Sequence, residues 1–67
     1  MGLRELRLAR RLSQRDLAYW VGVREATLSA WENGKAIPYP RHRKALAYRL
    51  GVSEQELGFD EGERERS

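Results

Sequence analysis

Most of the chain alternates between segments whose apolar residues recur at helical spacing and short breaks that contain glycine, proline or a capping residue. Leu3 and Leu6 lie one turn apart near the start of the chain. Leu28 and Trp31 repeat this spacing near its middle, and almost no segment shows the strict alternation that favours a strand. The pattern predicts five short helices, over roughly residues 3–10, 14–21, 25–33, 40–50 and 54–59.

The breaks carry residues that begin and end helices. Ser13 and Ser53 stand at N-cap positions, where a hydroxyl group can accept a hydrogen bond from a backbone N–H group of the first turn. Gly22 and Gly34 are expected to end the second and third helices, because glycine readily adopts the left-handed conformation found there. Pro40 suits the first turn of the fourth helix. The residues expected to face a shared core are Leu3, Leu6, Leu17, Ala18, Val21, Leu28, Trp31, Ala45, Leu46 and Leu50.

The chain has 67 residues and no cysteine, so packed side chains alone must hold its core together. A domain of about 60 residues buries only roughly 60% of its unfolded surface, which leaves no room for a deep substrate cavity. We therefore expect one domain over residues 1–59 and a charged tail over residues 60–67. The longest apolar run, residues 17–21, is too short for a membrane helix, and the N-terminus lacks a signal peptide's apolar stretch, so we expect a cytoplasmic protein.

The net charge of +3 is divided unevenly along the chain. Residues 1–52 contain eleven arginines and lysines against four acidic residues, and they carry a charge of +7. Residues 53–67 contain two arginines against six acidic residues, and they carry a charge of −4. A well-solvated surface is one interpretation of this many charges. The other interpretation is a basic body that binds a polyanion.

The order of the predicted helices, with a three-residue turn around a glycine between the second and third, is typical of a helix-turn-helix domain. The sequence LRELRLARRLSQRDLAYWVGVREATLSAWENGKAIP resembles the phage-repressor family of the Cro and cI type, which is also called XRE-like. The similarity continues without a gap through LAYRLGVSEQELGF, so it covers about residues 3–59. The residues that match the family's twenty-residue motif are Gln14, Ala18, Gly22, Leu28, Trp31 and Asn33.

This resemblance implies an all-α, five-helix fold like that of the lambda repressor. It also implies a sequence-specific, repressor-type transcriptional regulator that inserts its third helix into the major groove of double-stranded DNA. A structural pair between Arg7 and Glu32 is implied as well, together with a homodimer whose interface includes Leu57 and Phe59. The residues implied to contact DNA are Gln14, Arg15, Arg24, Glu25, Ala26, Thr27, Ser29, Ala30, Asn33, Lys35, Arg41 and Arg43.

Three features depart from the family pattern. Arg24 occupies the position where a serine or threonine usually caps the third helix, and the base-facing residues of that helix are mostly small. Tyr19 and Trp20 replace charged residues on the second helix. Either they form a surface for a protein partner, or Trp20 packs over the arginine-rich first helix. The alternative function is therefore a protein-interaction module, such as an antitoxin or scaffold, with the same fold.

No group of residues predicts catalysis. His42 is the single histidine and the chain has no cysteine, so we expect no metal site. The sequence NGK at residues 33–35 has one glycine and no preceding strand, which excludes a phosphate-binding P-loop. We therefore expect neither enzyme activity nor a cofactor.

Overall fold

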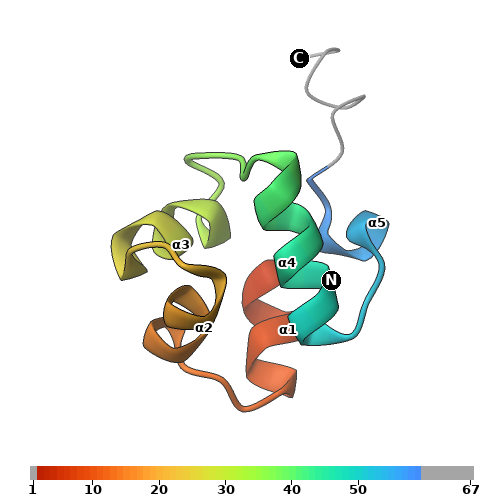
Figure 1. Ribbon diagram of the computed structural model, residues 1–67, viewed down its shortest axis with the longest axis horizontal. Coiled ribbons are helices and arrows are strands. Elements are labelled where there is room, and N and C mark those ends of the chain that lie inside the picture. The colour runs from red at the N-terminus through yellow and green to blue at the C-terminus, as the bar shows by residue number, and fades with distance from the viewer. Residues whose placement is uncertain (1, 60–67) are drawn as a thin grey trace.

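A computed structural model of the chain describes residues 2–59, which form five helices and contain no strand (Figure 1). The helices are α1 (Leu3–Ala9), α2 (Gln14–Val21), α3 (Glu25–Glu32), α4 (Pro40–Leu50) and α5 (Glu54–Leu57). This confirms the all-α, five-helix fold predicted from the sequence. The predicted tail at residues 60–67 lies outside the described residues. None of the helices within residues 2–59 is long and apolar enough to cross a membrane.

Three helices end earlier than the sequence pattern predicts. Arg10 and Asn33 occupy the C-cap positions of α1 and α3, so each of these helices is one residue shorter than expected. The last helix was expected to reach Phe59 but ends at Leu57. Gly58 is the cause, because its φ of 83° places it in the left-handed conformation that stops a helix.

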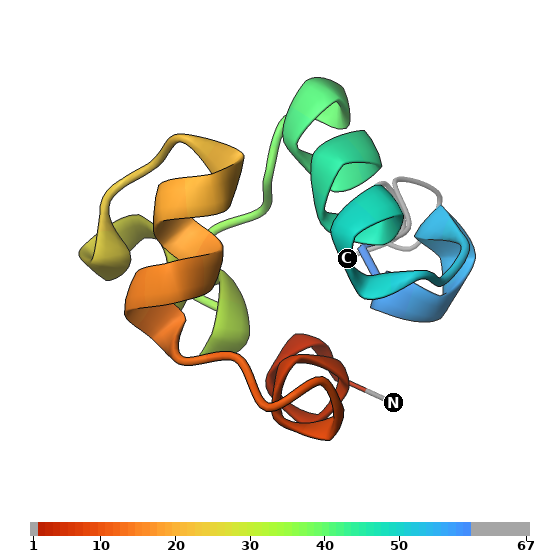
Figure 2. The same ribbon diagram turned by 60° about the horizontal axis from the view of Figure 1, so that its bottom comes forward.

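The five helices surround one core. α2 and α3 lie together on one side of the molecule, α4 and α5 lie on the other side, and α1 lies at the base between the two pairs (Figures 1 and 2). The largest fully buried side chains are Leu17 of α2, Leu28 of α3, and Leu46 and Leu50 of α4. The core therefore joins the two sides, and it fixes α3 against the rest of the domain.

The fourth helix buries a slightly different face from the one predicted. Ala45 was expected to face the core but is only half-buried, whereas Ala47 is buried. Leu46, Ala47 and Leu50 form the buried face because all three lie within about one turn on the same side of the helix. Ala45 lies at the rim of this face.

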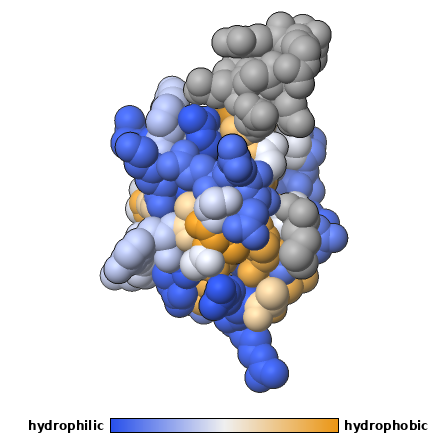
Figure 3. Space-filling model, turned by 90° about the vertical axis from the view of Figure 1, so that its right-hand side faces the viewer, coloured by the Kyte–Doolittle hydropathy of each residue, from blue (hydrophilic) through white to orange (hydrophobic). Residues whose placement is uncertain are grey.

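The last helix contributes to the core through Leu57, whose exposed fraction is 2%. The Leu57 side chain packs inside the core of the domain, so little of its surface is exposed, and its place in a dimer interface stays a prediction. Phe59 is half-buried and packs against the same core. Seen from the side that carries α5, the molecule has an apolar area in the middle of a largely hydrophilic surface (Figure 3).

Side-chain caps begin two of the helices as the sequence predicts. The Ser13 hydroxyl accepts a hydrogen bond of 2.9 Å from the backbone N–H of Asp16. The Ser53 hydroxyl accepts one of 3.3 Å from the N–H of Glu56, whose carboxylate in turn accepts the N–H of Ser53 at 2.9 Å. Arg24 makes no side-chain cap at the start of α3, so the expected weaker capping of that helix is confirmed.

The end of α3 is a Schellman motif that sets the direction of the following loop. Gly34 has a φ of 75°, the left-handed conformation expected of it. The backbone N–H of Lys35 donates to the carbonyl of Ala30 at 2.9 Å, and that of Gly34 donates to the carbonyl of Trp31 at 3.3 Å. These bonds satisfy carbonyl groups that the helix leaves unpaired, and they hold Lys35 directly after the helix.

The end of α1 has the same geometry without a glycine. Arg11 has a φ of 58°, and it is the one residue other than glycine with positive φ among residues 2–59. The N–H of Leu12 donates to the carbonyl of Arg7 at 3.2 Å, and the Arg7 guanidinium donates back to the carbonyl of Leu12 at 2.8 Å. Arg7 therefore stabilises a turn whose backbone conformation costs about 1 to 2 kcal/mol for an L-residue.

Candidate nucleic-acid interface

The third helix has one face in the core and the other in solvent. Leu28 and Trp31 are buried and anchor the helix. The residues on its outer side are Glu25 and Ala26, which are exposed, and Thr27, Ser29 and Ala30, which are half-buried. Within α3, Glu25 is thus the one long side chain that reaches solvent, because the side chain of Glu32 has no exposed surface. The outer face offers mainly small groups and backbone.

Four basic residues lie in the segments that precede and follow α3 in the chain. Arg15 lies in the first turn of α2, and Arg24 lies directly before α3. Lys35 follows the end of α3, and Arg41 lies in the first turn of α4, with its guanidinium 5.1 Å from the centre of the Tyr39 ring. All four cationic side chains are exposed, so they can meet an anion without unfolding any element.

Arg43 differs from these four cations. Its side chain is only 12% exposed. It donates to the carbonyl of Pro38 at 3.1 Å and lies 3.8 Å from the carboxylate of Glu54. Arg43 therefore connects the loop before α4 to α5, and it does not present its charge outward as the sequence-based assignment to DNA contact requires.

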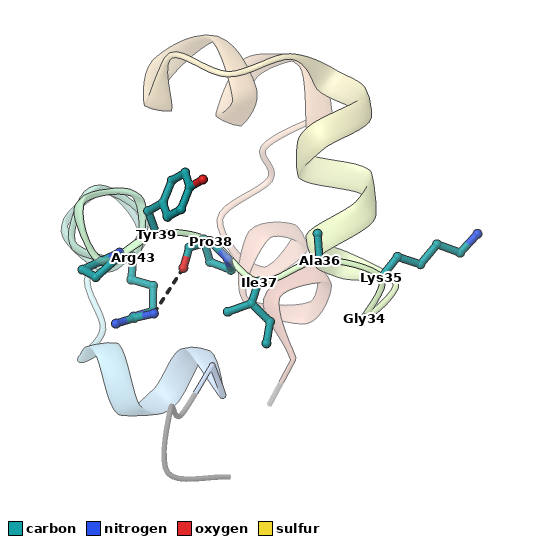
Figure 4. A pocket seen from close by; sticks show the side chains of 8 residues that line it. Gly34, Lys35, Ala36, Ile37, Pro38, Tyr39 and Arg43 are labelled. Atoms are coloured by element: carbon teal, nitrogen blue, oxygen red, sulfur yellow. Dashed lines mark hydrogen bonds between the residues drawn. The ribbon is translucent and has the colours of Figure 1, made fainter. Parts of the chain in front are cut away.

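A groove of about 400 Å³ lies along the loop between α3 and α4. Its lining includes Ile37, Pro38 and Arg43 (Figure 4). Lys35 also borders the groove, but its side chain extends away from the other labelled side chains (Figure 4). The charge of Lys35 is therefore directed toward solvent rather than into the groove.

Glu32, at the C-terminal end of α3, is the centre of a buried polar network. Arg7 donates from Nε to Oε2 of Glu32 at 2.5 Å and from Nη2 to Oε1 at 3.3 Å. Gln14 donates from Nε2 to the same Oε1 at 2.8 Å, and Arg4 lies 3.5 Å from it. One carboxylate thus ties α3 to α1 and to the start of α2. The structure brings together the two members of the Arg7 and Glu32 pair that the resemblance implied.

The network also controls the charge of Glu32. Burial raises the pKa of its carboxyl group, but hydrogen bonds from Arg7 and Gln14 and the positive charge of Arg7 act in the opposite direction and prevail. The pKa of Glu32 is therefore lowered from its ordinary value of 4.5, and the group is ionised in the folded protein at neutral pH.

The side-chain amides of Gln14 and Asn33 are both held by this network. Gln14 uses one of its donors on Glu32 and is half-buried. Asn33 is exposed; its Oδ1 accepts from Nη2 of Arg4 at 2.8 Å, and its Nδ2 donates to the hydroxyl of Ser29 at 3.3 Å. The sequence reasoning did not include Arg4, and the three-residue spacing from Arg4 to Arg7 on α1 is the signal that points to it.

His42 packs at the edge of the core. Its ring centre lies 5.4 Å from that of Trp31 and 5.9 Å from that of Tyr39. Its Nδ1 atom is buried and has no hydrogen-bond partner within residues 2–59. Burial and, to a smaller extent, the charge of Arg41 lower the pKa of His42. Within residues 2–59, no three histidine, cysteine or acidic side chains are grouped to hold a metal ion.

The two unusual aromatic residues of α2 remain on the surface. Tyr19 is almost fully exposed, and Trp20 is 46% exposed. The Trp20 ring stacks on Tyr48 of α4, with a distance of 6.1 Å between ring centres and an angle of 20° between planes. This ring contact is with α4, whereas one of the two interpretations of the sequence placed Trp20 over α1. Tyr48 is also exposed, so the stacked pair of rings lies on the surface.

Comparison with known families identifies the class to which this arrangement belongs. A family model described as "Helix-turn-helix domain" matches residues 2–58. The chain therefore belongs to the helix-turn-helix domain family, and the resemblance drawn from the sequence is confirmed.

The chain is also similar to a curated bacterial protein. The uncharacterized HTH-type transcriptional regulator RghRB of Bacillus subtilis (strain 168) is 46% identical to it over 56 residues. The match covers 82% of this chain, which spans 40% of the length of that relative. No solved structure gives a significant match.

Proposed function

We propose that this chain is the DNA-binding domain of a repressor-type transcriptional regulator, and that α3 enters the major groove of double-stranded DNA. The observation that carries the proposal is the exposed outer face of α3, together with the four exposed cations Arg15, Arg24, Lys35 and Arg41. The family match and the similarity to a transcriptional regulator support the same function. A helix of this size fits the major groove, and cations beside it can contact phosphates.

The proposed phosphate contacts follow from exposure and hydrogen bonding. Lys35 and Arg41 supply charge, while Asn33 and Gln14 supply amide groups whose positions are held by Arg4 and Glu32. Arg43 is not among the proposed phosphate contacts, because its side chain is engaged with Pro38 and Glu54.

Base reading is assigned to the outer residues of α3, with Glu25 as the main polar group. A carboxylate can accept a hydrogen bond from the amino group of cytosine. The other outer residues, Ala26, Thr27, Ser29 and Ala30, contribute apolar contacts and short hydroxyl groups.

We further propose that the domain acts as a homodimer. A two-fold DNA site places its half-sites about 34 Å apart, and two copies of α3 can then occupy successive major grooves. Phe59, which is half-buried, lies beside the core next to α5 and is the residue of the predicted interface that keeps exposed surface.

The proposal predicts a strong dependence of DNA binding on salt. Affinity for random duplex DNA, measured by fluorescence anisotropy, should fall linearly on a log–log plot, with a slope of about 0.9 per phosphate contact. Lys35→Ala should reduce this slope by about one unit and weaken binding to all sequences alike. Lys44→Ala is the matched control, because Lys44 is an exposed lysine outside the proposed contacts. Binding that does not change with salt contradicts the proposal.

A binding-site selection tests whether α3 reads bases. Glu25→Gln should change the preferred base at one position of each half-site, an effect of about 1 to 3 kcal/mol, with little change in affinity for random DNA. Glu54→Gln, on α5, provides the same chemical change away from α3. If the wild type and both variants select the same unspecific profile, α3 does not read bases.

A second candidate function is a protein-interaction module, and the exposed aromatic residues favour it. Trp20 and Tyr48 stack on each other while both keep much of their surface in solvent, and Tyr19, also on α2, is exposed as well. Aromatic residues of this kind are enriched in protein interfaces. If the affinity for random duplex DNA does not change with salt concentration, this candidate is favoured over the first.

A further inference from the structure

Arg4 lies on α1, outside the helix-turn-helix motif, and yet touches the residues at the end of α3. Its Nη2 donates to Oδ1 of Asn33 at 2.8 Å, and its Nε lies 3.5 Å from Oε1 of Glu32. The side chain is nevertheless 53% exposed. Arg4 is therefore at the boundary between the buried network and the proposed DNA-binding surface.

The cluster formed by Arg4, Arg7 and Glu32 has more positive than negative charge. Arg7 already holds both carboxylate oxygens of Glu32 and is itself buried. Glu5, the acid next to Arg4 in the chain, accepts the backbone N–H of Gly2 at 2.7 Å. Among the ion pairs of residues 2–59, Glu32 is the one carboxylate paired with Arg4. Two arginines thus share one carboxylate, and the excess positive charge lies on the more exposed of them.

Donor groups of Arg4 and Asn33 remain available at the same place. A guanidinium has five N–H groups. Within the described residues, Arg4 uses one on Asn33 and one in a weak contact with Glu32. Asn33 uses one amide N–H on Ser29 and has a second. Because the side chains of Arg4 and Asn33 are hydrogen-bonded to each other, two oxygen atoms of one anion can accept hydrogen bonds from both.

We propose that Arg4 is a further phosphate-binding residue, which contacts the DNA backbone together with Asn33 and also holds the amide of Asn33 in place. The inference rests on the proposed DNA-binding function and adds a cation from α1 to it. A phosphate at this position neutralises the excess charge of the cluster. The contact is independent of base identity, because its acceptor is the DNA backbone.

The test compares three variants of the full chain on random duplex DNA across a salt series. Arg4→Gln removes the charge but keeps an amide donor, and it should reduce affinity about tenfold and lower the salt slope by about one unit. Arg4→Lys keeps the charge, and its slope should stay at the wild-type value. Arg10→Gln is the control, because it removes an arginine charge at a different place. The Arg10 guanidinium packs against Gly51 at the end of α4, and a Cβ atom added to this glycine would lie 2.8 Å from Nη2 of Arg10.

A double-mutant cycle tests the shared contact. Arg4→Gln and Asn33→Ala together should weaken binding by less than the product of their separate effects, because both substitutions remove contacts to the same phosphate. Circular dichroism should give each variant a helical content close to that of the wild type.

The outcomes separate the inference from the function on which it rests. If the wild type binds DNA with a salt-dependent affinity but Arg4→Gln has the same slope and affinity, Arg4 is structural and the inference is overturned. Equal loss of slope in Arg4→Gln and Arg10→Gln also overturns it, because the effect is then one of general charge. If the wild type shows no salt-dependent binding, the proposed function itself fails.

Discussion

Replacing Glu32 with alanine should lower the free energy of unfolding by about 3 to 5 kcal/mol, the cost of leaving a buried charge without its partner. Arg7 remains buried in that variant, and Gln14 loses its acceptor as well. A loss of this size removes much of the stability of a small domain. Urea unfolding followed by circular dichroism measures it, and Glu32→Gln, which keeps an acceptor for Arg7, should lose less.

Two comparisons show whether the loss comes from the buried pair. Glu54→Ala breaks a more exposed ion pair with Arg43, whose atoms are 3.8 Å apart, and should cost less than about 1 kcal/mol. Combining Glu32→Ala with Arg7→Ala should cost less than the sum of the single changes. Additive losses in this cycle contradict the importance of the pair.

The pH dependence of stability provides an independent measurement of the same group. The pKa of Glu32 in the folded protein is below its ordinary value of 4.5. A carboxylate with a lowered pKa adds stability that is complete above its unfolded pKa and is lost as the pH falls through the folded one. The wild type should therefore lose stability below about pH 4.5, and Glu32→Ala should lack this part of the loss.

The second large effect is expected at Trp31. Its exposed fraction is 4%, and it packs between the core leucines and His42. Trp31→Ala should reduce the free energy of unfolding by about 3 to 5 kcal/mol, through lost burial and the cavity that remains. Far-UV circular dichroism during urea unfolding is the suitable measurement, because it does not depend on the tryptophan that is removed.

Trp20→Ala is the matched control, because it makes the same change at a tryptophan that is 46% exposed. It removes part of a surface stack with Tyr48, for which a loss of about 0.5 to 1.5 kcal/mol is expected. Equal losses in the two variants contradict the assignment of Trp31 to the core and Trp20 to the surface.

The sequence was sufficient to predict the five helices, since each has a local signal. Ser13 and Ser53 cap helices in the structure, and Gly22 and Gly34 have the positive φ expected of them. The unexpected left-handed residue is Arg11. It has no local signal because its turn is held by a contact from Arg7 to the carbonyl of Leu12.

The surface was harder to predict than the helices, because exposure depends on how the helices are packed. Arg43 and Arg41 are two residues apart in the same helix, yet one is directed toward α5 and the other toward solvent. The stacking of Trp20 on Tyr48 and the bond from Arg4 to Asn33 join residues at least 28 positions apart in the chain. Periodicity along one helix contains no information about such distant partners.

The separation of the two faces of α3 has a consequence for protein engineering. Leu28 and Trp31 hold the helix in the core, while its outer positions carry small residues with little packing to lose. Surface substitutions usually change stability by less than about 0.5 kcal/mol. A combinatorial library at the exposed positions Glu25 and Ala26 can therefore sample long side chains on a constant scaffold, so that new binding specificities are selected without redesign of the fold.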